Sequence, residues 1–82
     1  MVINEIKEIG VQLRAARKRR FPKDDLSAFA LRIGVSRATL QKMEKGDLSV
    51  GIGKYFAAAQ VLGLENGFRK LFESPAVDLF DD

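Results

Sequence analysis

The segment SRATLQKMEKG carries a set of side chains with the types and spacing needed to reach the edges of bases: Arg37, Ala38, Gln41 and Lys42. If this segment is a helix, residues at these spacings share one face. Arginine can hydrogen-bond guanine O6 and N7 together, glutamine and lysine can reach base edges or phosphates, and alanine offers apolar contact to a thymine methyl. The pattern predicts a face that reads the major groove of DNA, and the alternative for each residue is a solvated surface side chain.

Catalytic and metal chemistry find few suitable residues in the 82-residue chain. It has no Cys and no His, so disulfides, zinc-thiolate sites and the commonest acid/base group are excluded. The paired acids Asp24–Asp25 and Asp81–Asp82 are neighbours in sequence and are not opposed across a cleft, which disfavours an acid/base or metal role. We therefore expect no enzyme activity, no cofactor and no metal.

Charge is distributed unevenly along the chain, although the net charge is only +3. Residues 14–45 hold ten basic and three acidic residues, whereas residues 46–82 hold three basic and six acidic residues. A localised positive field favours a polyanionic partner, most often nucleic acid. The alternative is a protein-interaction module whose basic residues meet an acidic protein surface.

Hydrophobic periodicity predicts helices and no strand. A face of Ile6, Ile9, Leu13 and Ala16 predicts a first helix over residues 5–20, and Ile52, Phe56, Ala59 and Leu62 predict a fourth helix between a cap at Ser49 and a stop at Gly63. The remaining predicted helices cover residues 26–33, 37–45 and 65–73. The expected fold class is all-α with five helices.

A very tight turn separates the second and third predicted helices. Gly34 can adopt the left-handed conformation that ends a helix, and Ser36 is a preferred N-cap for the next one. Val35 can fill the core beneath the turn, and Ala30 is small enough for the two helices to approach closely. Helices joined this tightly cross steeply, as in a helix-turn-helix.

The segment AFALRIGVSRATLQKMEKG, residues 28–46, resembles the helix-turn-helix of the phage-repressor (Cro/XRE) family. The likeness rests on the A-x-x-x-G-V-S turn, an inward aliphatic at Leu40 and the closing Glu44-Lys45-Gly46. The resemblance implies a compact, five-helix, lambda-repressor-like DNA-binding domain over residues 1–73, followed by a short acidic tail over residues 74–82. It also implies a structural ion pair between Arg17 and Glu44.

A second set of polar residues is expected on backbone phosphates. The family often uses hydroxyls at the positions of Ser36 and Thr39, but Leu26 stands where a glutamine commonly holds a phosphate. Basic side chains can replace that contact, because phosphate contacts demand charge within reach more than fixed geometry. The expected phosphate contacts are Ser36, Thr39, Lys45, Arg19, Arg20 and Lys23.

The resemblance also implies partners. Repressors of this type usually bind palindromic double-stranded operators as homodimers, because one small module grips too little DNA. The aromatic C-terminal third is the expected dimer interface, through Phe68, Leu71 and Phe72.

More loosely, the chain resembles HipB-like antitoxins, which repress their own promoter and bind a HipA-type kinase toxin; the alternative is a stand-alone regulator. Val77, Leu79 and Phe80 in the tail are apolar among acids and could dock on a partner protein. The sequence has no signal-peptide pattern and no apolar run of membrane-spanning length, so we expect no membrane association and a cytoplasmic location.

Overall fold

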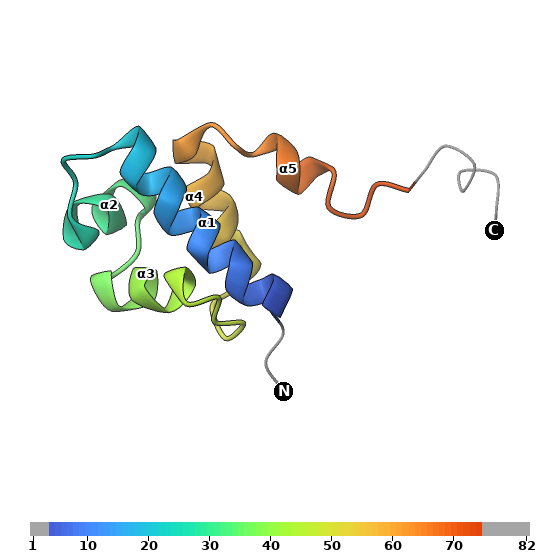
Figure 1. The fold of residues 1–82 in the computed structure, drawn as a ribbon, viewed down its shortest axis with the longest axis horizontal. Coiled ribbons are helices and arrows are strands. Elements are labelled where there is room, and N and C mark those ends of the chain that lie inside the picture. The colour runs from blue at the N-terminus through green and yellow to red at the C-terminus, as the bar shows by residue number, and fades with distance from the viewer. Residues whose placement is uncertain (1–3, 75–82) are drawn as a thin grey trace.

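Five helices and no strand make up the part of the chain that the computed structural model describes, residues 4–74 (Figure 1). The helices are α1 (Asn4–Arg20), α2 (Leu26–Ile33), α3 (Arg37–Glu44), α4 (Ile52–Leu62) and α5 (Asn66–Arg69). The all-α, five-helix prediction is confirmed. The tail residues Val77, Leu79 and Phe80 lie outside the described residues.

The core lies where the first four helices meet. Phe29 of α2 and Leu40 and Met43 of α3 are completely buried, and α1 and α4 close the core with Ala16 and Ala58. α1 and α4 contribute small residues to this core, and α2 and α3 contribute the large side chains that fill it. α1 and α4 therefore support the helix-turn-helix by packing against its buried side.

Local capping sets both ends of α2 and the start of α3. The Asp25 carboxylate accepts a hydrogen bond of 2.8 Å from the Ala28 N–H, and Ser36 Oγ accepts one of 3.0 Å from the Thr39 N–H. Gly34 has φ of 74°, and the next N–H, that of Val35, donates to the Ala30 carbonyl at 3.0 Å. These contacts satisfy backbone groups that helix ends leave unpaired, so only Val35 separates the C-cap of α2, Gly34, from the N-cap of α3, Ser36.

On α1, the prediction that Ile9 faces the core is wrong. Ile9 is 46% exposed, and the neighbouring Gly10 is buried instead. A Cβ on Gly10 would lie 2.5 Å from the Glu44 carbonyl oxygen and 2.6 Å from the Gly46 nitrogen. The backbones of α1 and the end of α3 therefore touch directly, and this contact turns Ile9 away from the core.

The start of α4 also differs from the prediction. Gly51, and not Ser49, is its N-cap residue, because the Ser49 N–H donates at 2.8 Å to the Asp47 carboxylate within the preceding loop. Tyr55 donates its hydroxyl hydrogen to the Asp47 carbonyl at 2.9 Å and ties the loop to α4. Ile52 is exposed, and the core face of α4 is formed by Ala58, Ala59 and Leu62.

The fifth helix is much shorter than the predicted span of residues 65–73. It covers only four residues, none of them buried, and its N-cap residue, Glu65, makes no side-chain capping bond. A helix this short gains too little from its own hydrogen bonds to extend without burial. None of the helices in residues 4–74 has the length and apolar character needed to cross a membrane.

Candidate nucleic-acid interface

The outer face of α3 carries the four predicted base-contacting residues. All four are exposed: Arg37, Ala38, Gln41 and Lys42. The opposite face of the same helix holds the fully buried Leu40 and Met43, so the core fixes which way α3 faces. Within residues 4–74, neither cation of this face forms an ion pair, which leaves both able to meet an external anion.

The N-terminus of α3 is built from two hydroxyl side chains. Ser36 donates its hydroxyl hydrogen to Thr39 Oγ1 at 2.9 Å and accepts the Thr39 N–H. Both hydroxyls are thus already engaged with each other, although hydroxyl oxygens keep further acceptor capacity. A phosphate contact by Thr39 would use its own hydroxyl hydrogen, which the Ser36 bond leaves unassigned.

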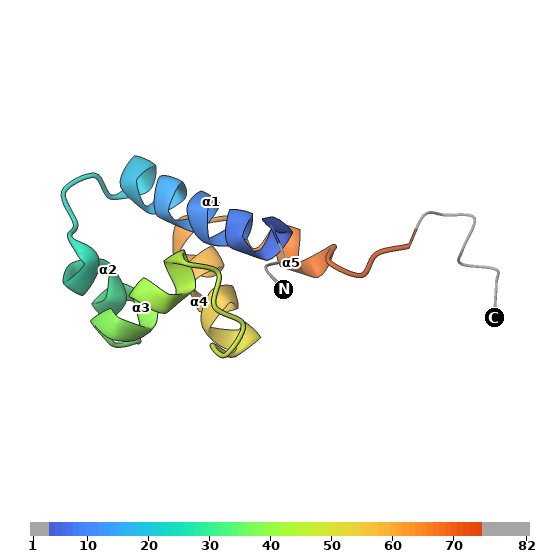
Figure 2. The ribbon, with the colours of Figure 1, turned by 60° about the horizontal axis from the view of Figure 1, so that its bottom comes forward.

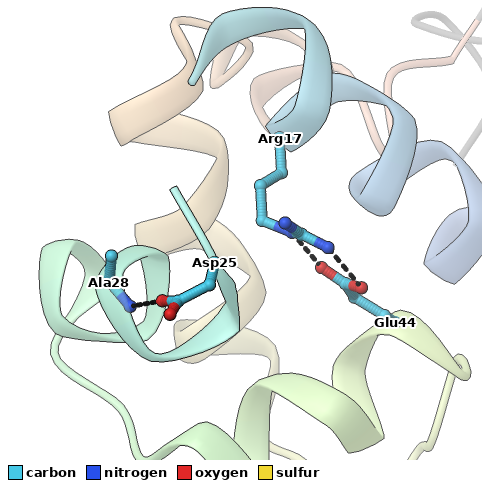
Figure 3. Close-up of polar contacts among 4 residues, drawn as sticks. All are labelled: Arg17, Asp25, Ala28 and Glu44. Atoms are coloured by element: carbon cyan, nitrogen blue, oxygen red, sulfur yellow. Dashed lines mark hydrogen bonds and ion pairs between the residues drawn. The ribbon is translucent and has the colours of Figure 1, made fainter. Parts of the chain in front are cut away.

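The buried ion pair expected between α1 and α3 is present (Figure 3). Arg17 Nε donates to Glu44 Oε2 at 2.7 Å and Nη2 donates to Oε1 at 3.2 Å, a two-pronged arrangement that fixes both side chains. Arg17 is only 5% exposed, the least exposed charged residue among those described. The pair joins the end of α3 to α1 and so orients the outer face of α3.

The predicted phosphate contacts at the other end of α1 lie around the loop to α2. Arg19 and Arg20 end α1, Lys23 is exposed in the loop, and the Arg20 guanidinium lies 5.2 Å from the centre of the Phe21 ring. Lys45, the last predicted phosphate contact, is exposed at the C-cap of α3. These four residues come from α1, the loop after it and the end of α3, whereas the four on the outer face of α3 come from one helix.

A second ion pair was not predicted from the sequence. Arg32 of α2 donates two hydrogen bonds to the carboxylate of Asp24, and its guanidinium lies 4.0 Å from the centre of the Phe21 ring. The hydrogen bond from Arg32, opposed by partial desolvation, lowers the pKa of Asp24 below its usual value. The i to i+8 spacing across a helix start gives no periodic signal, so only the folded loop brings the two residues together.

The predicted dimer residues lie away from the outer face of α3. Phe68 packs edge-on against Phe56 of α4, with ring centres 5.6 Å apart, whereas Leu71 and Phe72 are 51% and 92% exposed. With Ile52 they line an open hollow of about 390 Å³, which we call the α4–α5 surface. In both views α5 lies at the end of the molecule away from α2 and α3 (Figures 1 and 2). Residues 4–74 bring together no three carboxylates that could hold a metal ion.

The comparison with models of protein families agrees with this arrangement, and two other comparisons found no match. Neither the curated proteins nor the solved structures give a significant match to the chain. The sequence model of the family described as helix-turn-helix matches residues 13–65, which run from the middle of α1 past the end of α4. This span is well over half of the chain and contains α2, α3 and the Arg17–Glu44 pair. The chain therefore belongs to the helix-turn-helix family of Cro/XRE type, whose members are DNA-binding transcription regulators.

Proposed function

We propose that this chain is a transcriptional repressor that reads a palindromic duplex operator through α3. The observation that carries the proposal is the outer face of α3, where exposed polar residues back directly onto the buried Leu40 and Met43. A helix held this rigidly presents its polar residues in one fixed direction, as recognition of base edges requires.

Each residue of the face has a distinct role in this proposal. Arg37, in the first turn of α3, reads a guanine through O6 and N7, since the N-terminal residues of a recognition helix contact base edges. Gln41 and Lys42 reach base edges or phosphates one turn further on, and Ala38 meets a thymine methyl. Ser36, Thr39, Lys45, Arg19, Arg20 and Lys23 contact the phosphate backbone.

Selection of binding sites from random duplex DNA, followed by titration of the selected operator, tests the proposal. Arg37→Ala should weaken operator binding by about 1–3 kcal/mol and relax the preference at one base position. Arg14→Ala removes another exposed arginine, on α1, and serves as the matched control. Unchanged affinity and unchanged base preference in Arg37→Ala would remove Arg37 from base readout.

Salt dependence separates DNA binding from the alternative of an acidic protein partner. Binding to duplex DNA should weaken steeply and log-linearly with salt, because bound cations release condensed counterions from the phosphates. A chain that selects no sequence and binds duplex DNA without this slope would instead be a protein-interaction module.

The proposal includes a homodimer formed through the α4–α5 surface. Phe72 and Leu71 expose large apolar groups there, and a second copy would cover them while doubling the operator contacts. Phe72→Asp should give a monomer with unchanged helical circular dichroism and much weaker binding to a palindrome. Val11→Asp, at an exposed position on α1, is the control, and sedimentation showing wild-type monomer at tens of micromolar with tight operator binding would contradict the dimer.

A second candidate function is that of an antitoxin paired with a HipA-type kinase toxin. In this alternative the toxin, and not a second copy of the chain, occupies the α4–α5 surface. The position of α5, away from α3 in both views, favours it, because a partner seated there would leave the DNA-reading face open (Figures 1 and 2). Co-expression with the product of the adjacent gene tests it by copurification and by rescue of growth. Deletion of residues 75–82 then asks whether the tail takes part, and failure of both assays in the full chain would leave the stand-alone regulator.

A further inference from the structure

The loop between α1 and α2 places two carboxylates at the start of α2. The Asp25 side chain accepts the Ala28 N–H, and so occupies the end of α2 where backbone N–H groups point outward (Figure 3). Asp24 beside it binds the guanidinium of Arg32 through two hydrogen bonds. Both acids of the loop are therefore committed to α2.

Arg32 is held by more than its charge partner. Its guanidinium stacks over Phe21, and the Asp24 side chain that binds it is only 13% exposed, against 46% for Arg32 itself. The hydrogen bonds from Arg32 keep the pKa of Asp24 low, so the pair is charged at neutral pH. Arg32 thus adds to the basic count of residues 14–45 while its charge is neutralised by Asp24.

The position of these acids matters because of how a helix-turn-helix docks. The second helix enters the major groove while the first crosses the phosphate backbone, and α2 is the first helix here. A helix N-terminus and an arginine on that helix are both favourable partners for a phosphate. In this chain a carboxylate occupies the N-terminus, and a second carboxylate holds the arginine.

We propose that Asp24 and Asp25 limit the affinity of this protein for duplex DNA, by placing negative charge at the backbone-facing end of α2 and by withholding Arg32 from phosphates. The inference rests on the proposed function of α3. Capping alone does not require the charge of Asp25, because serine caps a helix about as well as aspartate. The charge therefore has an effect that can be separated from the structural role.

The test uses the operator selected for the full chain and fluorescence anisotropy between 50 and 300 mM salt. Asp25→Ser keeps a capping oxygen, and should bind about 3- to 10-fold more tightly at low salt with an unchanged melting temperature. Asp24→Asn should also bind more tightly, with a salt slope steeper by about one, because it frees Arg32 to reach a phosphate. Glu8→Gln, an equal change of net charge at an exposed site on α1, should change affinity less than about twofold.

Two results would overturn the inference and leave the proposed function intact. One is that Asp25→Ser and Asp24→Asn bind the operator no more tightly than the wild-type chain does. The other is an equal gain in Glu8→Gln, since net charge alone would then explain the effect. Failure of the wild-type chain to select or bind any duplex DNA would overturn both proposals together.

Discussion

The contact between α1 and α3 and the α4–α5 surface differ in how far the rest of the domain covers their side chains. At the first, Gly10 brings two backbones together and the Arg17–Glu44 pair is buried with its hydrogen bonds made within the chain. At the second, Phe72 is 92% exposed, whereas Phe68 packs against the ring of Phe56. The first region completes its packing with residues of this domain, and the second presents apolar groups that residues 4–74 do not cover.

This difference indicates where stability and association reside. Substitutions at the α1–α3 contact should act on the free energy of unfolding, because a close-packed region relaxes little around a change. Substitutions at the α4–α5 surface should leave the free energy of unfolding of the monomer nearly unchanged and act on association. Three experiments test this division, from the largest expected effect to the smallest, and a fourth concerns two loop carboxylates outside both regions.

Breaking the buried ion pair should have the largest effect. Glu44→Ala leaves Arg17 charged and buried without a partner, and should lower the free energy of unfolding by about 3–5 kcal/mol in urea titrations followed by circular dichroism. Replacing both partners, in Arg17→Met/Glu44→Leu, should bring stability back to within about 1 kcal/mol of wild type, because no charge then remains buried. If Glu44→Ala were as stable as wild type, the Arg17–Glu44 pair would not contribute to the stability of the α1–α3 contact.

Filling the space at Gly10 should have the next largest effect. Gly10→Ala forces a Cβ against the backbone of Glu44 and Gly46, and should cost about 1–3 kcal/mol in the same titrations. The control is Gly53→Ala in the first turn of α4, where a Cβ meets nothing within 4 Å. That variant should be neutral or more stable by up to about 1 kcal/mol, since alanine favours the helix. Equal effects at the two glycines would contradict the close approach.

Removing the most exposed aromatic ring should barely change monomer stability. Phe72→Ser should alter the free energy of unfolding of the monomer by less than about 0.5 kcal/mol, measured at low micromolar concentration. The contrasting variant is Phe29→Ala in the core, which should cost about 3–5 kcal/mol. A large loss in Phe72→Ser at every concentration would mean that α5 belongs to the core of the monomer.

The smallest expected effect is a dependence of stability on acidic pH. The pKa of Asp24 is lowered by the hydrogen bond from Arg32, and that of Asp47 mainly by the hydrogen bond from the Ser49 N–H. Because folding lowers both pKa values, the carboxylates stabilise the fold above their ordinary pKa of about 4, and this stabilisation is lost as the pH falls through the lower folded values. Melting temperatures between pH 2 and pH 6 should fall less steeply in Asp24→Asn and Asp47→Asn than in wild type, and parallel curves would contradict the assignment.

The α2–α3 unit was predictable because its signals are local. The stop at Gly34, the cap at Ser36 and the alternation of buried Leu40 with exposed Gln41 all act within one or two helical turns. α2 has the predicted bounds, and α3 ends one residue early, at Glu44. The outer face of α3 could therefore be predicted without knowing where the other helices lie.

Periodicity could not predict that Gly10, and not Ile9, is the buried residue at this point of α1. Apolar spacing ranks isoleucine above glycine on any helix face, and only the close approach of another backbone reverses that order. The shortness of α5 has a related cause. The spacing of Phe68, Leu71 and Phe72 is typical of a helix face, but a helix grows along such a face only where another surface buries it. Within residues 4–74, Phe68 packs against Phe56, whereas Leu71 and Phe72 remain exposed.

The sequence by itself thus determined the all-helical class, the tight turn and the direction in which Arg37 and its neighbours face. Caps, left-handed glycines and helical periodicity are properties of short segments, and they act in the same way wherever the segment is placed. Tertiary structure alone decided that Gly10 lies against the backbone of Glu44 and Gly46, and that Arg32 is neutralised by Asp24 over the ring of Phe21. Those outcomes depend on distances between segments that meet only after folding, and such distances leave no periodic trace in the chain.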